Sequence, residues 1–238
     1  MKKAIIIGGT SGIGRALAEK LVRENWTVGI TGRRENLLNE IKAKSENQIL
    51  TLKHDITELE SSDEKMDRLF NQLGTVDLVI VSSGYAEINR KLIWDIQKKV
   101  VETNVVGISK MYQYLFLKLK SQGHGHLVGI SSIASIRGNR HCPSYGAAKA
   151  YQANYLESLR CMSKKKNMGI KVTDVQPGFV DTAMAKGPGM FWVAPVEKAA
   201  NQIYSGVMKG KRKIYVTKRW RLIAWVLNLA PGWVLEKL

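Results

Sequence analysis

Residues 4–19 decide the fold: Ala-Ile-Ile-Ile-Gly-Gly-Thr-Ser-Gly-Ile-Gly-Arg-Ala-Leu-Ala-Glu. The apolar run at 4–7 predicts a short buried strand, glycines follow at 8, 12 and 14, and an amphipathic helix then begins. Glycines at these places permit a tight turn and let backbone N–H groups approach a pyrophosphate at the helix N-terminus. Because the loop directly follows the first strand and opens a helix, it predicts a dinucleotide-binding unit.

Five further apolar runs follow the first strand at intervals filled by helical patterns, and a last strand is predicted at 213–217. Alternation of this kind predicts an α/β fold, a three-layer doubly wound parallel sheet (Rossmann fold) in a single domain over 1–238. Helices are predicted over 89–103 and 105–121, and another from about residue 144 to 166. The segment 178–194 is rich in glycine and apolar residues, which predicts a mobile loop over a hydrophobic pocket.

The composition is that of a soluble globular protein of 238 residues with an unusual formal charge of +17. Such an excess of cations favours a partner of negative charge. Two cysteines and four scattered histidines have no metal-binding spacing, so we expect no metal site and a reducing, cytoplasmic setting. The N-terminal apolar run is interrupted at Gly8, too early for a signal peptide, and no apolar segment is long enough to span a membrane.

Tyr145 and Lys149 lie four residues apart in a predicted helix, so their side chains project from one face. An ammonium beside a phenol favours the phenolate, and we therefore expect the pKa of Tyr145 to be lowered. This makes Tyr145 a candidate proton donor and acceptor near neutral pH. Ser132 ends the apolar strand 126–132, where its hydroxyl could hydrogen-bond a substrate carbonyl.

The second strand ends in Gly32-Arg33-Arg34. An acidic residue near this point would bind the ribose 2′-OH of NAD, but two guanidinium groups stand here instead. Guanidinium forks suit a 2′-phosphate, so we predict NADP(H) in preference to NAD(H). The alternatives are that both arginines are solvated residues at a helix start, or that Glu35 neutralises them.

In this order and spacing, the motifs of residues 3–217 resemble those of the short-chain dehydrogenase/reductase (SDR) family, in particular its NADP(H)-preferring carbonyl reductases. The resemblance depends on the glycine motif 8–14, Asp55, Asn104, Ser132, Tyr145-x-x-x-Lys149 and the run 177–182.

The resemblance implies a catalytic set of Asn104, Ser132, Tyr145 and Lys149. Tyr145 would exchange a proton with the substrate oxygen, Lys149 would lower the pKa of Tyr145 and bind the nicotinamide ribose, Ser132 would position the oxygen, and Asn104 would help to hold a proton-relaying water. The implied cofactor-binding residues are Gly8, Thr10, Ser11, Gly12, Ile13, Gly14, Arg33, Arg34, Asp55, Ile56, Ser83, Gly84, Asn104, Tyr145, Lys149, Pro177, Gly178, Val180 and Thr182.

The sequence departs from the family where most members carry Asn-Asn-Ala-Gly and this chain carries Val81-Ser-Ser-Gly84. Gly84 preserves backbone access, whereas the hydrogen bonds of the asparagine side chains are lost. The resemblance also implies a homodimer or homotetramer through the helices at 105–121 and 144–165.

The family does not account for residues 209–238, a basic, tryptophan-rich appendage. Cations beside tryptophan and leucine are typical of a segment that lies in a membrane interface. Peripheral membrane contact through 209–238 is one interpretation, and packing on the protein's own surface or on another subunit is the other.

Three functions compete at this point. We expect an NADPH-dependent oxidoreductase that interconverts a ketone and a secondary alcohol, with a small, hydrophobic substrate such as a steroid or long-chain keto compound. A 3-oxoacyl-carrier-protein reductase would use the same chemistry. An NADP(H)-binding regulatory or interaction protein is the non-enzymatic alternative, and nucleic-acid binding is not expected because aromatic residues do not alternate with the cations outside the tail.

Overall fold

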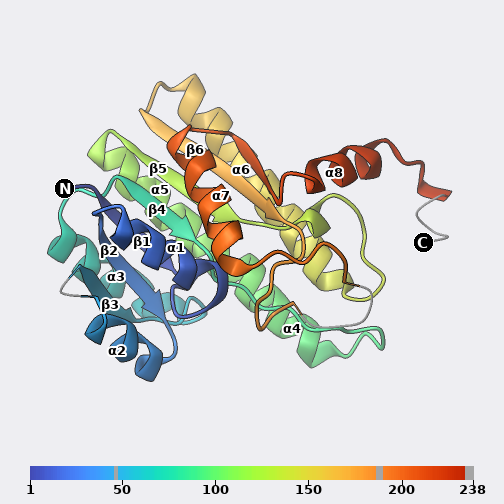
Figure 1. The fold of residues 1–238 in the computed structure, drawn as a ribbon, viewed down its shortest axis with the longest axis horizontal. Helices are drawn as coiled ribbons and strands as arrows, with labels where there is room; N and C mark the ends of the chain where they lie inside the picture. The colour runs from blue at the N-terminus through green and yellow to red at the C-terminus, as the bar shows by residue number, and fades with distance from the viewer. Residues whose placement is uncertain (46–47, 186–189, 234–238) are drawn as a thin grey trace.

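The computed structural model describes residues 1–45, 48–185 and 190–233 (Figure 1). Its centre is one parallel sheet in the order β3-β2-β1-β4-β5-β6-β7. The strands are β1 Lys3–Ile7, β2 Thr27–Gly32, β3 Ile49–Lys53, β4 Leu78–Val81, β5 Gly125–Ile130, β6 Ile170–Pro177 and β7 Lys213–Val216. All neighbouring pairs are parallel, which confirms the predicted doubly wound sheet.

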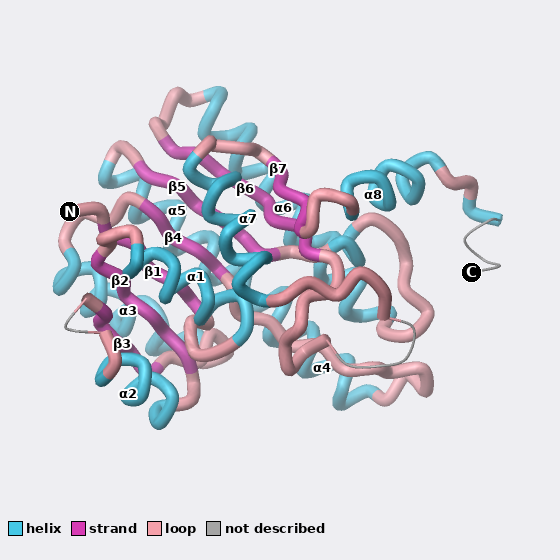
Figure 2. The backbone as a smooth tube through the Cα atoms, viewed as in Figure 1, coloured by secondary structure: helices cyan, strands magenta, loops and turns pink. Residues whose placement is uncertain are grey.

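Helices cover both faces of the sheet, giving three layers (Figures 1 and 2). One face packs against α1 Gly12–Arg23, α2 Glu35–Ala43 and α7 Val196–Met208, and the other against α3 Leu59–Leu73, α5 Ile108–Gln122 and α6 Pro143–Lys165. In β1, Ile6 belongs to the first core, while Ile5 and Ile7 belong to the second. Successive strand residues point to opposite faces, so a strand buried on both sides must be apolar throughout.

The strand order reverses between β1 and β4, because β2 and β3 extend the sheet on one side and the later strands extend it on the other. At such a switch point, the loops after two neighbouring strands separate and leave a crevice at the carboxyl edge of the sheet. The glycine loop after β1 and the segment Ser82–Gly84 after β4 therefore face the same crevice.

The helical region before α5 differs from the two helices predicted at 89–103 and 105–121. The structure has α4 Trp94–Val101, a π-helical turn at Glu102–Gly107 and then α5. The first helix begins later because the Asn89 side chain accepts from Ile93 N at 2.8 Å and donates to Ile93 O at 2.9 Å, which closes a loop ahead of it. Asn104 lies inside the π turn and not between two separate helices.

The C-terminal appendage, residues 209–238, first contributes β7 to the sheet and then forms α8 Trp220–Leu229, which extends away from the sheet (Figure 1). Trp220 and Ala224 are buried against the protein. Residues 234–238 of the appendage and 186–189 of the predicted loop 178–194 lie outside the described residues. Within the rest of that loop, Val180 pairs with Ala194 in a short parallel bridge.

Candidate active site

A cavity of about 1020 Å³ opens at the carboxyl edge of the sheet. Its wall contains almost every residue that the sequence predicts for the site. Residues of that wall come from the glycine loop, the ends of β2, β4, β5 and β6, and the start of α6. Gly14 and Asn104 are the predicted residues that do not line the cavity. Gly14 packs against Gly8 of the glycine loop, and Asn104 bonds to the loop after β4.

The glycine loop is held in a shape that only glycine fits. A Cβ atom on Gly8, which has φ +86°, would lie 2.7 Å from Ser83 N, and one on Gly14 would lie 2.1 Å from the Gly8 carbonyl oxygen. The N-cap residue Ser11 makes no side-chain cap bond, and the first turn of α1 contains no acidic residue. The N–H groups of this turn therefore suit a negatively charged pyrophosphate.

The two arginines after β2 have different partners. Arg34 Nη2 donates to Thr10 Oγ1 at 2.8 Å and to Ser11 Oγ at 2.7 Å, so its guanidinium lies over the glycine loop. Arg33 pairs more loosely with Asp55, at 3.6 Å. Glu35, the neutralising partner of the alternative interpretation, pairs with Lys53 at 2.9 Å. The positive charge of Arg34 is thus directed at the crevice.

Asp55 and Ile56 form the part of the wall beyond β3. The Asp55 carboxylate accepts from Thr57 N at 3.0 Å and from Thr57 Oγ1 at 2.8 Å. Burial raises the pKa of Asp55, but the two bonds from Thr57 and the charge of Arg33 together lower it by more. The net result is a pKa below the usual value of an aspartate. Asp55 is therefore an anionic acceptor at the edge of the pocket.

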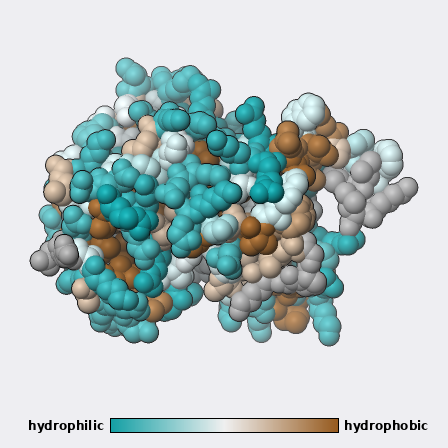
Figure 3. Space-filling model, in the orientation of Figure 1, coloured by the Kyte–Doolittle hydropathy of each residue, from teal (hydrophilic) through white to brown (hydrophobic). Residues whose placement is uncertain are grey.

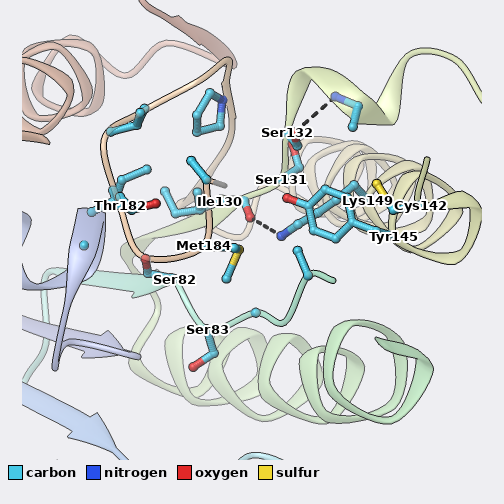
Figure 4. A pocket seen from close by; sticks show the side chains of 18 of the residues that line it. Ser82, Ser83, Ile130, Ser131, Ser132, Cys142, Tyr145, Lys149, Thr182 and Met184 are labelled. Atoms are coloured by element: carbon cyan, nitrogen blue, oxygen red, sulfur yellow. Dashed lines mark hydrogen bonds between the residues drawn. The ribbon is translucent and has the colours of Figure 1, made fainter. Parts of the chain in front are cut away.

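Tyr145, Ser132 and Lys149 lie together on one side of the pocket, opposite Thr182 (Figure 4). Ser132 extends from the end of β5, where its Oγ accepts from Ala134 N at 3.1 Å. Burial raises the pKa of Tyr145 to about 12, while the hydrogen bond with Ser132 acts in the opposite direction. The phenol consequently holds its proton at neutral pH, as a proton donor to a bound carbonyl requires.

Lys149 does not lower the pKa of Tyr145 in this arrangement, contrary to our expectation. Its ammonium lies 5.8 Å from the centre of the Tyr145 ring and donates to Ile130 O and Gln152 Oε1, both at 2.9 Å. Burial lowers the pKa of Lys149 to about 8, with Asp174 acting against this change. The ammonium of Lys149 is thus hydrogen-bonded to acceptors other than Tyr145. The pKa of Tyr145 is therefore determined mainly by burial.

Asn104 is fully buried, and its polar groups bond to protein atoms. Its side chain accepts from Tyr85 N at 2.8 Å and donates to Tyr85 O at 2.6 Å, while its carbonyl oxygen accepts from Gln152 Nε2 at 2.7 Å. The Asn104 side chain thus fixes the loop after β4, and a role for Asn104 in holding a water stays a prediction. A Cβ on Gly84, in the same loop, would lie 3.7 Å from Lys149 Nζ.

The segment after β6 closes the pocket on the side opposite Tyr145. Pro177 ends β6, and a Cβ on Gly178 would fall 2.0 Å from the Trp220 ring, so only glycine admits the indole. Val180 is held by the bridge to Ala194, and Thr182 lies beside Gly12, 3.2 Å from where a Cβ of that glycine would be. These contacts place Val180 and Thr182 in the cavity wall beside the glycine loop.

Three residues of the site were not predicted from the sequence. Gln152 follows Lys149 by one helical turn on the same face, a spacing that could have revealed it. Asp174 is 1 % exposed on β6, where it accepts from Ser131 Oγ, and no local pattern marks it. Trp220 covers Gly178 from a distant part of the chain, which only the tertiary structure brings close.

The wall of the cavity as a whole is mostly apolar and includes part of the C-terminal appendage. Arg137 donates to three carbonyl oxygens near the end of α8, at 2.8 Å to Leu227 O, 2.9 Å to Asn228 O and 3.3 Å to Ala230 O. This arginine thereby attaches α8 to the loop that follows Ser132. Apolar residues of the wall include Ile88, Ile133, Phe179, Met184, Met190, Trp220 and Leu227, and polar or charged ones near them are Glu87, Arg137, Asn139, Arg140 and His141.

Within residues 1–45, 48–185 and 190–233, no three His, Cys, Asp or Glu side chains form a cluster suited to a metal ion. The same ranges contain no helix that is both long and apolar enough to cross a membrane.

Comparison with known proteins identifies the family. The family model described as short chain dehydrogenase matches residues 2–189. An uncharacterized oxidoreductase of Myxococcus xanthus is 28 % identical over 221 residues, covering 90 % of this chain and 86 % of the relative. A short chain dehydrogenase from Burkholderia cenocepacia in complex with NADP shares the fold with a TM-score of 0.85 at 21 % identity, over 100 % of this chain and 99 % of its own.

A short chain dehydrogenase/reductase from Burkholderia phymatum in complex with NAD has a TM-score of 0.83 at 16 % identity, over 94 % of this chain and 92 % of its own. Structures of this fold therefore occur with either dinucleotide. With its family model, parallel sheet and glycine loop in agreement, the chain belongs to the short-chain dehydrogenase family of oxidoreductases.

Proposed function

We propose that this protein is an NADPH-dependent reductase that converts a lipophilic ketone to a secondary alcohol, and the reverse. The observation that carries the proposal is the placement of Tyr145, Ser132 and Lys149 beside the same cavity as the glycine loop. The apolar residues of the cavity wall support a hydrophobic substrate, because burial of apolar surface provides the main binding free energy in such pockets.

The residues of the cavity fit a dinucleotide from end to end. The N-terminus of α1 would hold the pyrophosphate, Arg34 and Arg33 the 2′-phosphate, Asp55 and Ile56 the adenine, and Lys149 the nicotinamide ribose. Val180 and Thr182 would fix the carboxamide and so the face of the ring that meets the substrate. When bound, the reduced nicotinamide supplies the hydride.

The residues on the substrate side orient the carbonyl group and transfer a proton to its oxygen. Ser132 hydrogen-bonds the carbonyl oxygen and orients it towards Tyr145. Tyr145 then donates its phenolic proton to that oxygen as the carbonyl carbon is reduced.

The test is NADPH oxidation with ketones of graded chain length, compared between the wild type and Tyr145→Phe. We expect kcat/KM to rise with chain length and the phenylalanine variant to lose almost all activity. Unchanged activity in Tyr145→Phe would contradict the proposal. Reduction of a 3-oxoacyl chain only when it is attached to a carrier protein would support the reductase of that class, and NADPH binding without turnover of any ketone would support a regulatory protein.

We further propose that the protein works at a membrane surface, in the reducing cytoplasm that its two free cysteines favour. One face of α8 and the turn after it exposes Leu222, Trp225, Val226, Leu229 and Trp233, which are 57–66 % exposed (Figure 3). The exposed cations Lys218, Arg219 and Arg221 stand at the start of α8 in the sequence, and such cations are attracted to an anionic lipid surface. Since the opposite face of α8 lines the cavity, a substrate dissolved in lipid would have a short path to it.

Vesicle co-sedimentation tests the membrane contact. Deletion of 219–238 would also remove Trp220 from the pocket, so the variants of choice are Leu222→Ser and Trp225→Ser on the exposed face. We expect the wild type to bind vesicles that contain phosphatidylglycerol and both variants to bind them less. Equal binding by all three proteins would contradict the contact, and concentration-dependent dimers lost in both variants would show that α8 binds a second subunit.

Self-association is proposed separately, through α5 and α6. Leu117, Tyr151 and Met162 on these helices are 38–52 % exposed, and packing of such residues against a second copy would bury them. We expect a homodimer or homotetramer by light scattering, and Leu117→Lys to shift the mass towards the monomer. A monomeric wild type would contradict this proposal.

A further inference from the structure

A buried side-chain amide connects Lys149 to the π turn. Gln152 Oε1 accepts from Lys149 Nζ at 2.9 Å, and Gln152 Nε2 donates to Asn104 O at 2.7 Å. Gln152, Lys149 and Asn104 are 1 %, 4 % and 0 % exposed, so none of these groups can exchange its partner for bulk water without rearrangement. A primary amide is suited to this place because it accepts and donates at once from one rigid group.

The far end of this connection is itself fixed. Asn104 lies in the π turn, and its side chain makes two hydrogen bonds with the main chain of Tyr85. The near end is the ammonium, which also donates to Ile130 O at 2.9 Å. Two of the three N–H groups of Lys149 are thus bound to protein acceptors, and one remains for the cavity that Lys149 lines.

We propose that Gln152 is a positioning residue, which holds the Lys149 ammonium beside Tyr145 by connecting it to the main chain of the π turn. The effect of Gln152 on catalysis rests on the proposed reductase function. The contact between Gln152 and Lys149 does not depend on that function. The Gln152 side chain, which extends from α6, thus stands between Lys149 and the main chain of Asn104.

The charges near Lys149 determine what the loss of Gln152 should do. Asp174 from β6 stabilises the ammonium, Tyr145 on α6 is neutral at pH 7, and burial destabilises the charge. Without the Gln152 acceptor, one interaction that stabilises the charged form of Lys149 is lost, while burial still destabilises it. The ammonium should therefore lose its proton at a lower pH. It also leaves the buried Asn104 carbonyl oxygen without its partner.

The test compares Gln152→Met, Gln152→Glu and the control Tyr151→Phe. Methionine has a similar length but neither bonds the ammonium nor donates to Asn104. Glutamate keeps the acceptor and adds a negative charge. Tyr151 neighbours Gln152 on α6, and its hydroxyl bonds Ser109 Oγ at 2.7 Å, so the control also removes one hydrogen bond from this helix.

Two readouts are measured on each protein. The first is the titration of the Lys149 side chain by ¹³C NMR of its ε-carbon, identified by its loss in Lys149→Arg. We expect its midpoint to fall by about one pH unit in Gln152→Met, to rise in Gln152→Glu and to stay in Tyr151→Phe. The second is the split of kcat and KM for a ketone with NADPH, where we expect about a tenfold loss of kcat in Gln152→Met with little change in KM.

The outcomes separate the two proposals. A Gln152→Met protein that melts at a lower temperature but keeps both the titration midpoint and kcat of the wild type would show a structural role only, and overturn the assignment. A shifted midpoint in a protein whose wild type reduces no ketone would support the positioning role and refute the reductase function. A shift of the same size in Tyr151→Phe would also overturn the assignment.

Discussion

Replacement of Arg34 by alanine should change the choice of cofactor. Its Nη2 atom is fixed over the glycine loop by Thr10 Oγ1 at 2.8 Å and Ser11 Oγ at 2.7 Å, and it forms no ion pair within the described ranges. A 2′-phosphate placed there would receive a charge-assisted hydrogen bond, worth about 1.5–3 kcal/mol in buried settings. Because Arg34 is exposed, we expect the lower end of this energy range, about 1.5 kcal/mol. That free energy corresponds to about a tenfold loss of affinity.

The effect should be confined to NADPH, because NADH carries no phosphate at this position. We expect Arg34→Ala to raise the Kd for NADPH about tenfold and to leave the Kd for NADH almost unchanged. Arg33→Ala should have a smaller effect, because the Arg33 side chain is 63 % exposed and its guanidinium already faces Asp55 at 3.6 Å.

Fluorescence titration of both dinucleotides gives the two constants directly. Arg23→Ala is the matched control, since it removes the same charge from the far end of α1, where Arg23 is exposed. Equal losses for NADPH and NADH in Arg34→Ala would refute the reasoning. So would a loss for NADPH of the same size in Arg23→Ala, which would reflect net charge alone.

Three further perturbations test other parts of the structure. Gly14→Ala would place a Cβ 2.1 Å from the Gly8 carbonyl oxygen, so we expect a displaced glycine loop and weaker binding of both dinucleotides by fluorescence titration, and an unchanged Kd would contradict this. Burial lowers the pKa of His126 to about 4, so the unfolded state takes up a proton first as the pH falls below 6.5. In urea titrations the wild type should therefore lose about 2 kcal/mol more unfolding free energy between pH 7 and pH 5 than His126→Asn does, and equal losses in the two proteins would contradict this. The pKa of Lys149 is about 8, so affinity for the anionic cofactor should decrease above that pH in the wild type but not in Lys149→Met, and parallel curves would contradict this.

The arrangement of the sheet and most of the site could be predicted from the sequence, because the relevant signals are local. A β-branched run, a glycine loop and an amphipathic helix follow one another within residues 4–23, and their order alone indicates the direction of strand, loop and helix. Tyr145 and Lys149 could be paired from their spacing, since a helix places i and i+4 on one face.

The electrostatics of the site depended on the tertiary structure. The spacing of Tyr145 and Lys149 led us to expect a lowered tyrosine pKa, but it contains no information on the depth at which α6 packs or on the acceptors that Ile130 and Gln152 offer the ammonium. Burial dominates, and the pKa of Tyr145 rises. A free energy of desolvation belongs to the packed molecule and not to a sequence motif.

The C-terminal appendage shows the same division. Its alternation of cations, tryptophan and leucine was evident from the sequence, but not which face of the helix would be covered. The structure buries Trp220 over Gly178 and attaches the end of α8 to Arg137, while Leu222 and Trp225 stay exposed. Local periodicity determines that a helix has an apolar face, whereas contacts between distant parts of the chain determine what that face touches.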